Sequence, residues 1–358
     1  MKLNILHIAP MNTSGVPGQL VQAERCLGHN SRLVTLYRDR RRYFEDICLD
    51  LPFIDFSATA WIKKRVSAPE KLFVDNKVRI PEAIPLAWRP NSAAENALVR
   101  LRDLLWKPRI EKAIREHRLD RFDVYQLDGG LDFYRFPRFI PRVKNERNKL
   151  ICCYTGSDLR TRGVIPGIDR LSDLNVTVEF DHLKLHPHIH HVFFPFDAAR
   201  LPAMSMRRSG RTRIGHAPTN WQAKGSDVIV PCLLRLEKEQ GIEMVLIENV
   251  PYERALELKG SCDIFVDQIG DLGYGINSLE ALAMGIPCCS CLAPGFSALY
   301  PDHPFIEVDA GNLYQELARL IKKPALRRQK GRYGRKWVLQ MHDSRAVVRK
   351  IHHLAGLD

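Results

Sequence analysis

The sequence alternates short apolar segments with longer segments of helical periodicity, and this alternation limits the possible folds more than any other feature. Apolar runs typical of strands are found in the first half at residues 3–9, 31–37, 123–127, 149–154, 175–178 and 191–194, with helical stretches at residues 19–27 and 93–117. In the second half we expect strands at residues 213–217, 243–248, 263–268, 286–290 and 305–308, and helices at residues 227–240, 252–259, 278–284 and 312–322. Such alternation with short connections predicts an α/β chain of doubly wound parallel sheets.

The 358 residues suggest two domains, since a domain holds about 150 residues. Residues 198–211, rich in proline, serine and arginine and with little periodicity, are expected to link a first domain over residues 1–197 to a second over residues 212–335. No apolar run approaches the roughly 18 residues of a membrane helix, and the first residues lack the features of a signal peptide. The nine cysteines are an odd count that favours reduced thiols, so we expect a cytoplasmic location.

The formal net charge of +13 favours anionic partners, such as nucleotide phosphates or an anionic membrane surface. Basic runs at residues 38–43 and 326–336 are either solvated faces or attracted to such a membrane, which predicts a peripheral position at its inner face. A nucleic-acid partner is not expected, because no helix–turn–helix, zinc-finger or aromatic-stacking pattern accompanies the charge.

Three loops that follow expected strands carry residues suited to ligand binding, because ligands of open parallel sheets lie beyond the carboxyl ends of the strands. The first loop, residues 13–18, holds Gly15 and Gly18, which let the backbone approach a ligand ahead of a helix N-terminus that favours phosphate. It lacks the G-x-G-x-x-G pattern of dinucleotide-binding domains, and an ordinary turn explains it equally well.

The second loop, residues 216–227, places Lys224 and Gly225 just before a helix. A lysine beside a helix N-terminus is a point charge suited to a pyrophosphate. The alternative is a helix start capped by Ser226 or Asp227, with Lys224 in solvent.

The third loop has glycines at positions 270, 273 and 275 before a short helix that holds Asn277, Ser278 and Glu280. A glycine-rich loop can wrap a phosphate with backbone N–H groups, and Glu280 would then accept hydrogen bonds from ribose hydroxyls. The spacing of Asn277 and Glu280 equally fits a capping box that only closes the start of the helix.

Four segments, in order along the chain, together resemble the retaining GT-B glycosyltransferases of family 4, also called group 1. Residues 273–287 (GYGINSLEALAMGIP) are similar to the donor-site signature of that family, and residues 216–227 are similar to its Lys-Gly donor loop. Residues 154–160 and 194–197 resemble its first-domain Gly-Ser-Asp loop and the Asp turn before its linker. The resemblance implies a GT-B fold of two Rossmann-like domains facing a central cleft, with the last residues, 336–358, forming a helix that crosses back to the first domain.

The resemblance also implies an activity and roles for residues. Such an enzyme, a hexosyltransferase or a related transferase, moves a sugar from a nucleotide-diphosphate donor to an acceptor hydroxyl with retention of anomeric configuration. It uses no metal ion. It also needs no cofactor, because the nucleotide sugar is a substrate. Lys224 would neutralise the leaving diphosphate and Glu280 would hold the ribose. The expected donor-binding residues are Gly15, Lys224, Gly225, Gly273, Gly275, Asn277, Ser278 and Glu280.

Three positions differ from the family pattern. Leu272 stands where the signature has its first acidic residue, and Asp271 lies one place earlier. Thr219 replaces a basic residue that precedes the lysine in the family, and Thr155 replaces the histidine before Gly-Ser-Asp. These differences leave a second function open, a catalytically silent GT-B protein that binds a glycan or a protein partner. A sugar-nucleotide epimerase is less favoured, because the Lys224 and Glu280 segments look like those of a transferase.

The first domain is expected to hold the acceptor, a glycan or a lipid-linked molecule. Residues 40–95, not assigned to elements, contain Phe53, Phe56, Trp61 and Trp88 near the arginines of residues 38–42; these aromatics suit such an acceptor or, more simply, pack in the core. Asp128 and Asp158 follow strands and are the candidate catalytic residues; the alternatives are a turn residue and a loop cap. The histidines of residues 186–191 lack a framing cysteine or carboxylate cluster, so no metal site is expected.

Overall fold

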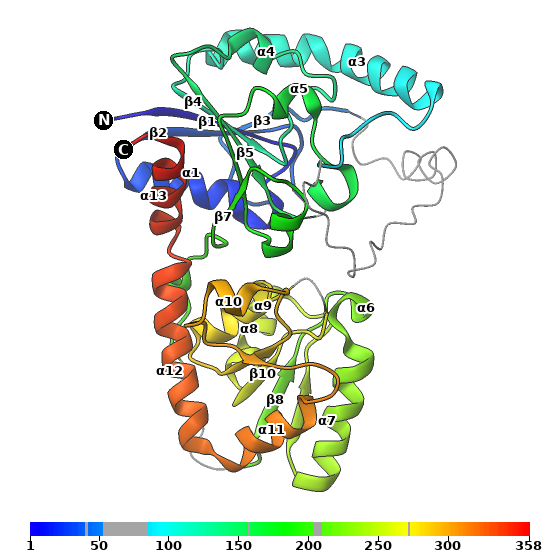
Figure 1. The fold of residues 1–358 in the computed structure, drawn as a ribbon, viewed down its shortest axis with the longest axis vertical. Helices are drawn as coiled ribbons and strands as arrows, with labels where there is room; N and C mark the ends of the chain where they lie inside the picture. The colour runs from blue at the N-terminus through cyan, green and yellow to red at the C-terminus, as the bar shows by residue number, and fades with distance from the viewer. Residues whose placement is uncertain (40–41, 53–84, 157, 204–209, 271–272) are drawn as a thin grey trace. The chain divides into compact units, whose positions relative to one another are not determined.

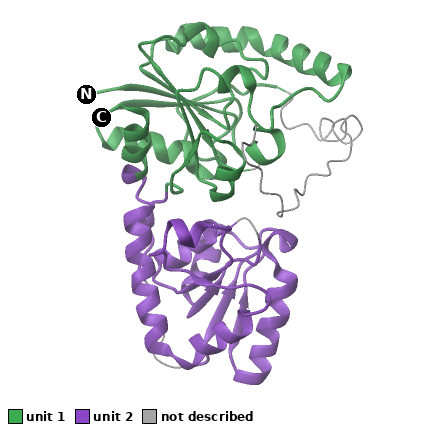
Figure 2. Ribbon diagram, in the orientation of Figure 1, with its two compact units in different colours: residues 1–195, 347–358 green, residues 196–346 purple. Residues whose placement is uncertain are grey.

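Two parallel sheets form from the short apolar strands, one in each compact unit of the chain (Figure 1). The computed structural model describes residues 1–358 except 40–41, 53–84, 157, 204–209 and 271–272. Unit 1 comprises residues 1–195 and 347–358, and unit 2 comprises residues 196–346 (Figure 2).

The described residues of unit 1 hold a seven-stranded sheet in the order β3-β2-β1-β4-β5-β6-β7, with parallel pairing throughout. Its strands are β1 (Asn4–Ala9), β2 (Asn30–Thr35), β3 (Ile47–Cys48), β4 (Val124–Asp128), β5 (Lys149–Tyr154), β6 (Leu174–Thr177) and β7 (Ile189–His191). Its helices include α1 (Val16–Cys26), α3 (Ala93–His117), α4 (Ile140–Val143), α5 (Pro166–Asp169) and most of α13 (Ser344–Ala355).

Alternate residues of the central strands β1, β4 and β5 enter different cores, as the period of a strand requires. In β5, Leu150 and Cys152 join the core that contains Trp106, Ile110 and Ile114 of α3. Ile151 and Cys153 join the core on the other face, together with residues of α1 and α13. Both faces of the sheet are therefore covered, which explains why its central strands read as continuous apolar runs.

The described residues of unit 2 hold a five-stranded parallel sheet in the order β12-β11-β10-β8-β9. Its strands are β8 (Arg213–His216), β9 (Glu243–Leu246), β10 (Ile264–Val266), β11 (Cys288–Ser290) and β12 (Ile306–Glu307). Its helices include α6 (Trp221–Lys224), α7 (Ser226–Gln240), α8 (Tyr252–Gly260), α9 (Ile276–Ala283), α10 (Phe296–Leu299), α11 (Leu313–Lys322) and α12 (Pro324–Met341).

The expected α/β class with doubly wound parallel sheets is confirmed, and two details of the expected elements are wrong. The strand expected at residues 191–194 lies earlier, as β7 (Ile189–His191). A short edge strand, β3, falls in the stretch that the sequence left unassigned. Among the described residues, no helix combines the length and apolar character needed to cross a membrane.

The buried side chain of Glu24 connects the last helix of the chain, α13, to the sheet of unit 1. Glu24 of α1 lies 2.8 Å from the Nε2 atom of His7 in β1 and 3.6 Å from the Nε2 atom of His352 in α13. Burial by itself raises the pKa of Glu24, but the neighbouring His7 and hydrogen bonds from His352 and His7 lower it to about 2. The carboxylate therefore binds these two histidines far below neutral pH.

We expect Glu24→Gln to destabilise unit 1 at neutral pH and to reduce its sensitivity to acid. A folded-state pKa of about 2 against the ordinary 4.5 means that the stabilisation by Glu24 is complete above pH 4.5 and is lost as the pH falls towards 2. Denaturant unfolding should show a loss of about 1.5–3 kcal/mol at neutral pH, with the gap between variant and wild type closing as the pH falls. The exposed Glu116→Gln is the matched control; a Glu24→Gln protein as stable as wild type at neutral pH would contradict this role.

Candidate functional site

The carboxyl ends of the unit 2 strands bring the second and third sequence-predicted loops together. Strand β10 lies between β8 and β11, all three parallel, so their carboxyl ends share one edge of the sheet. His216 ends β8, and Asp267 follows β10 directly. At the same edge, Gly275 lies at the start of α9 and contacts Asp267.

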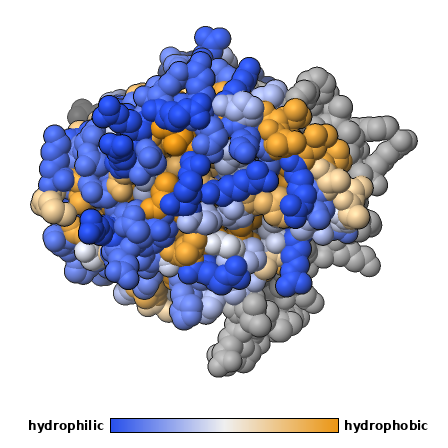
Figure 3. Space-filling view, turned by 90° about the horizontal axis from the view of Figure 1, so that it is seen from above, coloured by the Kyte–Doolittle hydropathy of each residue, from blue (hydrophilic) through white to orange (hydrophobic). Residues whose placement is uncertain are grey.

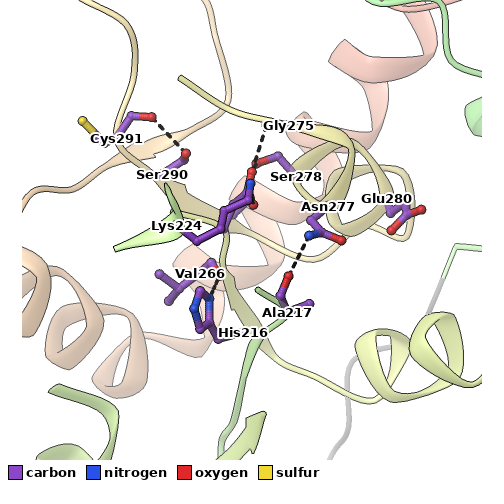
Figure 4. A network of polar contacts seen from close by, with 12 residues as sticks. His216, Ala217, Lys224, Val266, Gly275, Asn277, Ser278, Glu280, Ser290 and Cys291 are labelled. Atoms are coloured by element: carbon purple, nitrogen blue, oxygen red, sulfur yellow. Dashed lines mark hydrogen bonds and ion pairs between the residues drawn. The ribbon is translucent and has the colours of Figure 1, made fainter. Parts of the chain in front are cut away.

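The side chain of Asp267 is the centre of a polar network at this edge. Its partners Lys224, Gly275 and Ser278 lie close together in Figure 4. Its Oδ1 atom accepts a hydrogen bond from Lys224 Nζ at 2.7 Å, and its Oδ2 atom accepts from Gly275 N at 2.9 Å and Ser278 Oγ at 2.7 Å. Burial by itself raises the pKa of this carboxyl, but the charge of Lys224 and the three hydrogen bonds outweigh it and lower the pKa below the ordinary value. Asp267 is therefore an ionised carboxylate held at the N-terminus of α9.

Two short helical segments bring Lys224 to Asp267. Asn220 caps α6 by accepting a hydrogen bond from Ala223 N at 3.0 Å, and Lys224 ends this helical turn. Gly225 follows with φ 65°, and a Cβ atom there would overlap the carbonyl group of Ile269. Only glycine avoids both the strain and the overlap, so Gly225 lets the turn between α6 and α7 pack against the segment after β10.

The solvated alternative for Lys224 is wrong. Its side chain is only 14% exposed, in the ion pair with Asp267. The N-cap of α7 is Gly225, with no side-chain cap from Ser226 or Asp227. Lys224 is therefore fixed in unit 2 as the cation of a buried carboxylate.

Glu280 is engaged by two residues of α8. Its Oε1 atom accepts a hydrogen bond from the Tyr252 hydroxyl at 2.8 Å, and its Oε2 atom pairs with Lys259 Nζ. Both members of this ion pair are buried, with Lys259 1% and Glu280 3% exposed. Lys259 also donates to Asn277 Oδ1 at 2.9 Å, and Asn277 Nδ2 donates to the Ala217 carbonyl at 2.8 Å.

The capping-box interpretation of Asn277 and Glu280 is wrong. Helix α9 begins at Ile276 with Gly275 as its N-cap, so Asn277 lies inside the helix. The side chains of Asn277 and Glu280 meet at Lys259 and do not close the helix N-terminus. Glu280 thus has a tertiary partner that neither sequence interpretation included.

His216 joins three elements at the same edge. Its Nδ1 atom lies 2.9 Å from the Val266 carbonyl oxygen and its Nε2 atom lies 2.8 Å from Ser226 Oγ. Burial lowers the pKa of His216 below its ordinary value, against the effect of the hydrogen bond to Val266. A neutral ring donates from Nδ1 and accepts at Nε2, so His216 ties β8 to β10 and to the start of α7.

In unit 1, Asp128 ends β4, and Asp158 lies in the turn that follows the neighbouring strand β5. Asp158 begins the helical turn η2 (Asp158–Arg162) after β5, and its carboxylate accepts backbone hydrogen bonds from Thr155 at 3.0 Å, Gly156 at 3.1 Å and Leu159 at 2.7 Å. Asp128 ends β4 and is buried; this burial and the charge of Asp158 raise its pKa well above the ordinary value. Asp158 shapes its loop, whereas Asp128 keeps its proton to a higher pH than a solvated aspartate does.

Gly15 lies in the first loop of unit 1, where it is the N-cap of α1 with φ 76°. Asn12 closes this loop by accepting a hydrogen bond from Gly18 N at 3.1 Å, and Pro17 occupies the first helical turn. These contacts complete an ordinary turn, and the role of Gly15 in donor binding stays a prediction.

Several predicted positions lie outside the described residues, namely Arg40, Arg41, Phe53, Phe56, Trp61, Asp271 and Leu272. Trp88 packs edge-on against Phe136, with ring centroids 5.3 Å apart, beside the first core of unit 1. In the described part of the chain, no group of three or more histidine, cysteine or acidic side chains is arranged to hold a metal ion.

The sequence patterns did not single out Asp267, Lys259 or Tyr252. Asp267 had a usable signal, because it is a carboxylate directly after a buried strand, at the sheet edge where ligands of parallel sheets bind. Lys259 had none, since a lysine in the last turn of a helix is ordinary.

The two parallel α/β units, with the last residues returning to unit 1, define a GT-B fold, and solved structures of this class confirm the expected fold. The catalytic domain of starch synthase IV from Arabidopsis thaliana, bound to ADP and acarbose, is similar with a TM-score of 0.61 and 12% identity over 99% of each chain. Sucrose-phosphate synthase from Thermosynechococcus elongatus is similar with a TM-score of 0.58 and 12% identity, over 99% of this chain and 98% of that one. Anabaena HepE in complex with UDP gives a TM-score of 0.58 at 10% identity, over 99% of this chain and 100% of that one. No protein-family model matches the chain, and no curated protein matches it.

Removing either partner of the Lys224–Asp267 pair is expected to destabilise unit 2. Lys224→Met leaves a buried carboxylate without its cation, a loss of about 3–5 kcal/mol. The double variant Lys224→Met/Asp267→Asn removes both charges, so it should be more stable than the sum of the single effects predicts. Urea unfolding of the four proteins measures this coupling, with the exposed Lys238→Met as control. If the stability losses of the two single variants add up to the loss of the double variant within about 0.5 kcal/mol, the ion pair contributes nothing to stability.

Proposed function

We propose that this protein is a glycosyltransferase that moves a sugar from a nucleotide-diphosphate donor to a hydroxyl group of a glycan or lipid-linked acceptor. The observation that carries the proposal is the network of Lys224, Asp267, Gly275 and Ser278 at the N-terminus of α9, in a chain with the GT-B fold. HepE and starch synthase IV, which share that fold, were solved with UDP and ADP. The proposal carries this nucleotide chemistry over to the residues of this chain.

The donor diphosphate would bind beside Lys224 at the N-terminus of α9. The first N–H groups of a helix lack intrahelical partners, and the helix dipole favours an anion there. The Lys224 ammonium has three N–H donors, so it can hold Asp267 with one and contact phosphate oxygens with the others. When the sugar leaves, this fixed positive charge stabilises the departing diphosphate.

Glu280 would bind the donor ribose by exchanging one partner. Tyr252, which donates to Glu280 Oε1, is 59% exposed, whereas Lys259 is buried on the other carboxylate oxygen. A ribose hydroxyl that replaces the Tyr252 hydroxyl leaves the carboxylate fully hydrogen-bonded. Lys259 keeps the Glu280 carboxylate in place during this exchange.

The same proposal covers the course of the reaction. Lys224 and the α9 N-terminus supply the positive charge that a metal ion supplies in other transferases, so transfer proceeds without a metal. The transfer retains the anomeric configuration.

Asp128, with its raised pKa, is the better acid–base candidate, because the Asp158 carboxylate is occupied by three backbone N–H groups. The net charge of +13 suits a cytoplasmic enzyme peripheral to an anionic membrane.

Lys224→Ala is expected to weaken donor binding. A screen of UDP-, ADP-, GDP- and dTDP-sugars by thermal shift identifies the donor, because a ligand at 100 times its Kd stabilises the fold by about 2.7 kcal/mol. Calorimetry should then show an affinity loss of about 2–3 kcal/mol for Lys224→Ala, the value of charge-assisted hydrogen bonds, at a temperature where the variant is folded. Lys238→Ala, exposed in the same unit, serves as control. If folded Lys224→Ala binds donor as tightly as wild type, Lys224 is purely structural.

Glu280→Gln tests the ribose contact separately. A neutral amide accepts weaker hydrogen bonds, so donor affinity should fall by about 1.5–3 kcal/mol, while Tyr252→Phe, which removes the competing hydroxyl, should bind donor at least as tightly as wild type. Glu253→Gln, exposed on α8, is the matched control. Equal donor dissociation constants for folded Glu280→Gln and wild type would remove Glu280 from the donor site.

A catalytically silent GT-B protein that binds a glycan or protein partner is the second candidate function. The observation that favours it is the internal carboxylate of Asp267, which already takes hydrogen bonds from Lys224 and Gly275 N. If no nucleotide sugar shifts the melting temperature, this second function replaces the first.

A further inference from the structure

Helix α3 has two apolar faces, and among the described residues only one of them packs in a hydrophobic core. Trp106, Ile110 and Ile114, spaced four residues apart, lie in the core of unit 1. Leu98, Leu101 and Leu105 have helical spacing too, but with about 3.6 residues per turn they fall on the opposite side of the helix. The helix therefore carries a second apolar stripe that lies outside the cores formed by the described residues of unit 1.

The outer stripe is exposed to solvent. Leu98 is 48%, Leu101 54%, Leu104 59% and Leu105 52% exposed. Figure 3, which looks onto the end of the molecule where α3 lies in Figure 1, shows apolar residues gathered within a largely hydrophilic surface. Exposed leucines grouped on one helix face mark an interaction site more often than scattered ones do.

Basic side chains flank the stripe on both sides. By helical spacing, Arg100 and Lys107 lie along one border, and Arg102 and Arg109 lie along the other. Lys112 and Arg115 extend the positive charge towards the C-terminal end of the helix. Acidic residues of α3 offset part of this charge, because the buried Asp103 pairs with Arg102 and the exposed Glu116 lies 3.6 Å from Lys112. The positive charge along the stripe therefore comes mainly from Arg100, Lys107, Arg109 and Arg115.

We propose that α3 docks unit 1 on an anionic lipid surface, with the four leucines in the outer part of the acyl layer and the basic borders on the headgroups. An apolar stripe between lysine and arginine borders is typical of helices that lie in a membrane interface, and each basic residue near anionic lipid adds attraction. A second copy of the chain is a poorer occupant, because a two-fold contact through this stripe would bring like-charged borders together. The inference specifies the surface behind the proposed membrane location and does not depend on the donor site.

Vesicle co-sedimentation of the full chain tests the docking surface. Wild type should bind vesicles of phosphatidylcholine and phosphatidylglycerol, bind phosphatidylcholine alone weakly, and release as salt is added. The triple variant Leu98→Ser/Leu101→Ser/Leu105→Ser should bind at least about tenfold more weakly, because the buried apolar surface is lost. Leu234→Ser/Leu299→Ser, at exposed leucines of unit 2, should bind like wild type. Because the replaced leucines are exposed, all variants should keep the wild-type melting temperature and donor affinity.

Two charge-reversal variants distinguish binding through α3 from general electrostatic attraction of the protein to anionic vesicles. Lys107→Glu/Arg115→Glu should weaken vesicle binding by about tenfold or more, whereas Lys238→Glu/Lys322→Glu, with the same change in net charge, should not. Equal losses in both would overturn the proposal in favour of net charge alone. If vesicle binding is lost with Arg328→Glu/Arg332→Glu but kept by the α3 variants, the membrane contact lies at the basic run of residues 326–336 and the proposal for α3 is overturned. The proposal is also overturned if wild type does not bind vesicles but forms a dimer in sedimentation velocity that the triple serine variant abolishes. The stripe would then be a self-association face.

Discussion

The buried carboxylate of Asp267 needs positive charge around it, and the arrangement of the candidate site follows from this need. An ionised group removed from water is strongly unfavourable unless it is paired and hydrogen-bonded. Lys224, Gly275 N and Ser278 Oγ meet the requirement, and they come from two different segments, the end of α6 and the start of α9. The anion therefore fixes the distance between the turn after α6 and the N-terminus of α9, the two elements proposed to hold the donor diphosphate.

Helix α9 is held at three points along its length. Asp267 binds its N-terminus, Lys259 binds Asn277 and Glu280 in the middle, and α12 packs so closely at its far end that a Cβ atom on Gly331 would overlap the Gly285 carbonyl. These contacts oppose reorientation of the helix when charge changes at its N-terminus. Fixed dipoles and charges stabilise a developing anion without reorganisation, so this rigidity suits the release of a diphosphate.

Much of the fold could be predicted from the sequence, because strand and helix periods are local properties of the chain. The runs that became β1, β5, β8 and β10 are apolar and bounded by turn residues, and their alternation with helices predicted parallel sheets. The edge strand β3 (Ile47–Cys48) escaped notice because two residues are too few for a periodic signal. The pairing of Lys224 with Asp267 and of Glu280 with Lys259 was not predictable, since these partners are distant in sequence and only the folded sheet and α8 bring them near.

Helix α3 shows a different limit of sequence patterns. Its two apolar stripes lie on opposite sides of the helix, so their contributions to a single-sided periodicity cancel, and the segment looks like a surface helix of mixed charge. The structure separates the stripes, because Trp106, Ile110 and Ile114 are buried in the core while the four outer leucines are about half exposed. Burial explains the inner stripe completely. The outer leucines lie outside the cores of the described residues and, left exposed, increase the risk of aggregation. Their grouping between basic borders is therefore better explained by a surface that covers them than by folding.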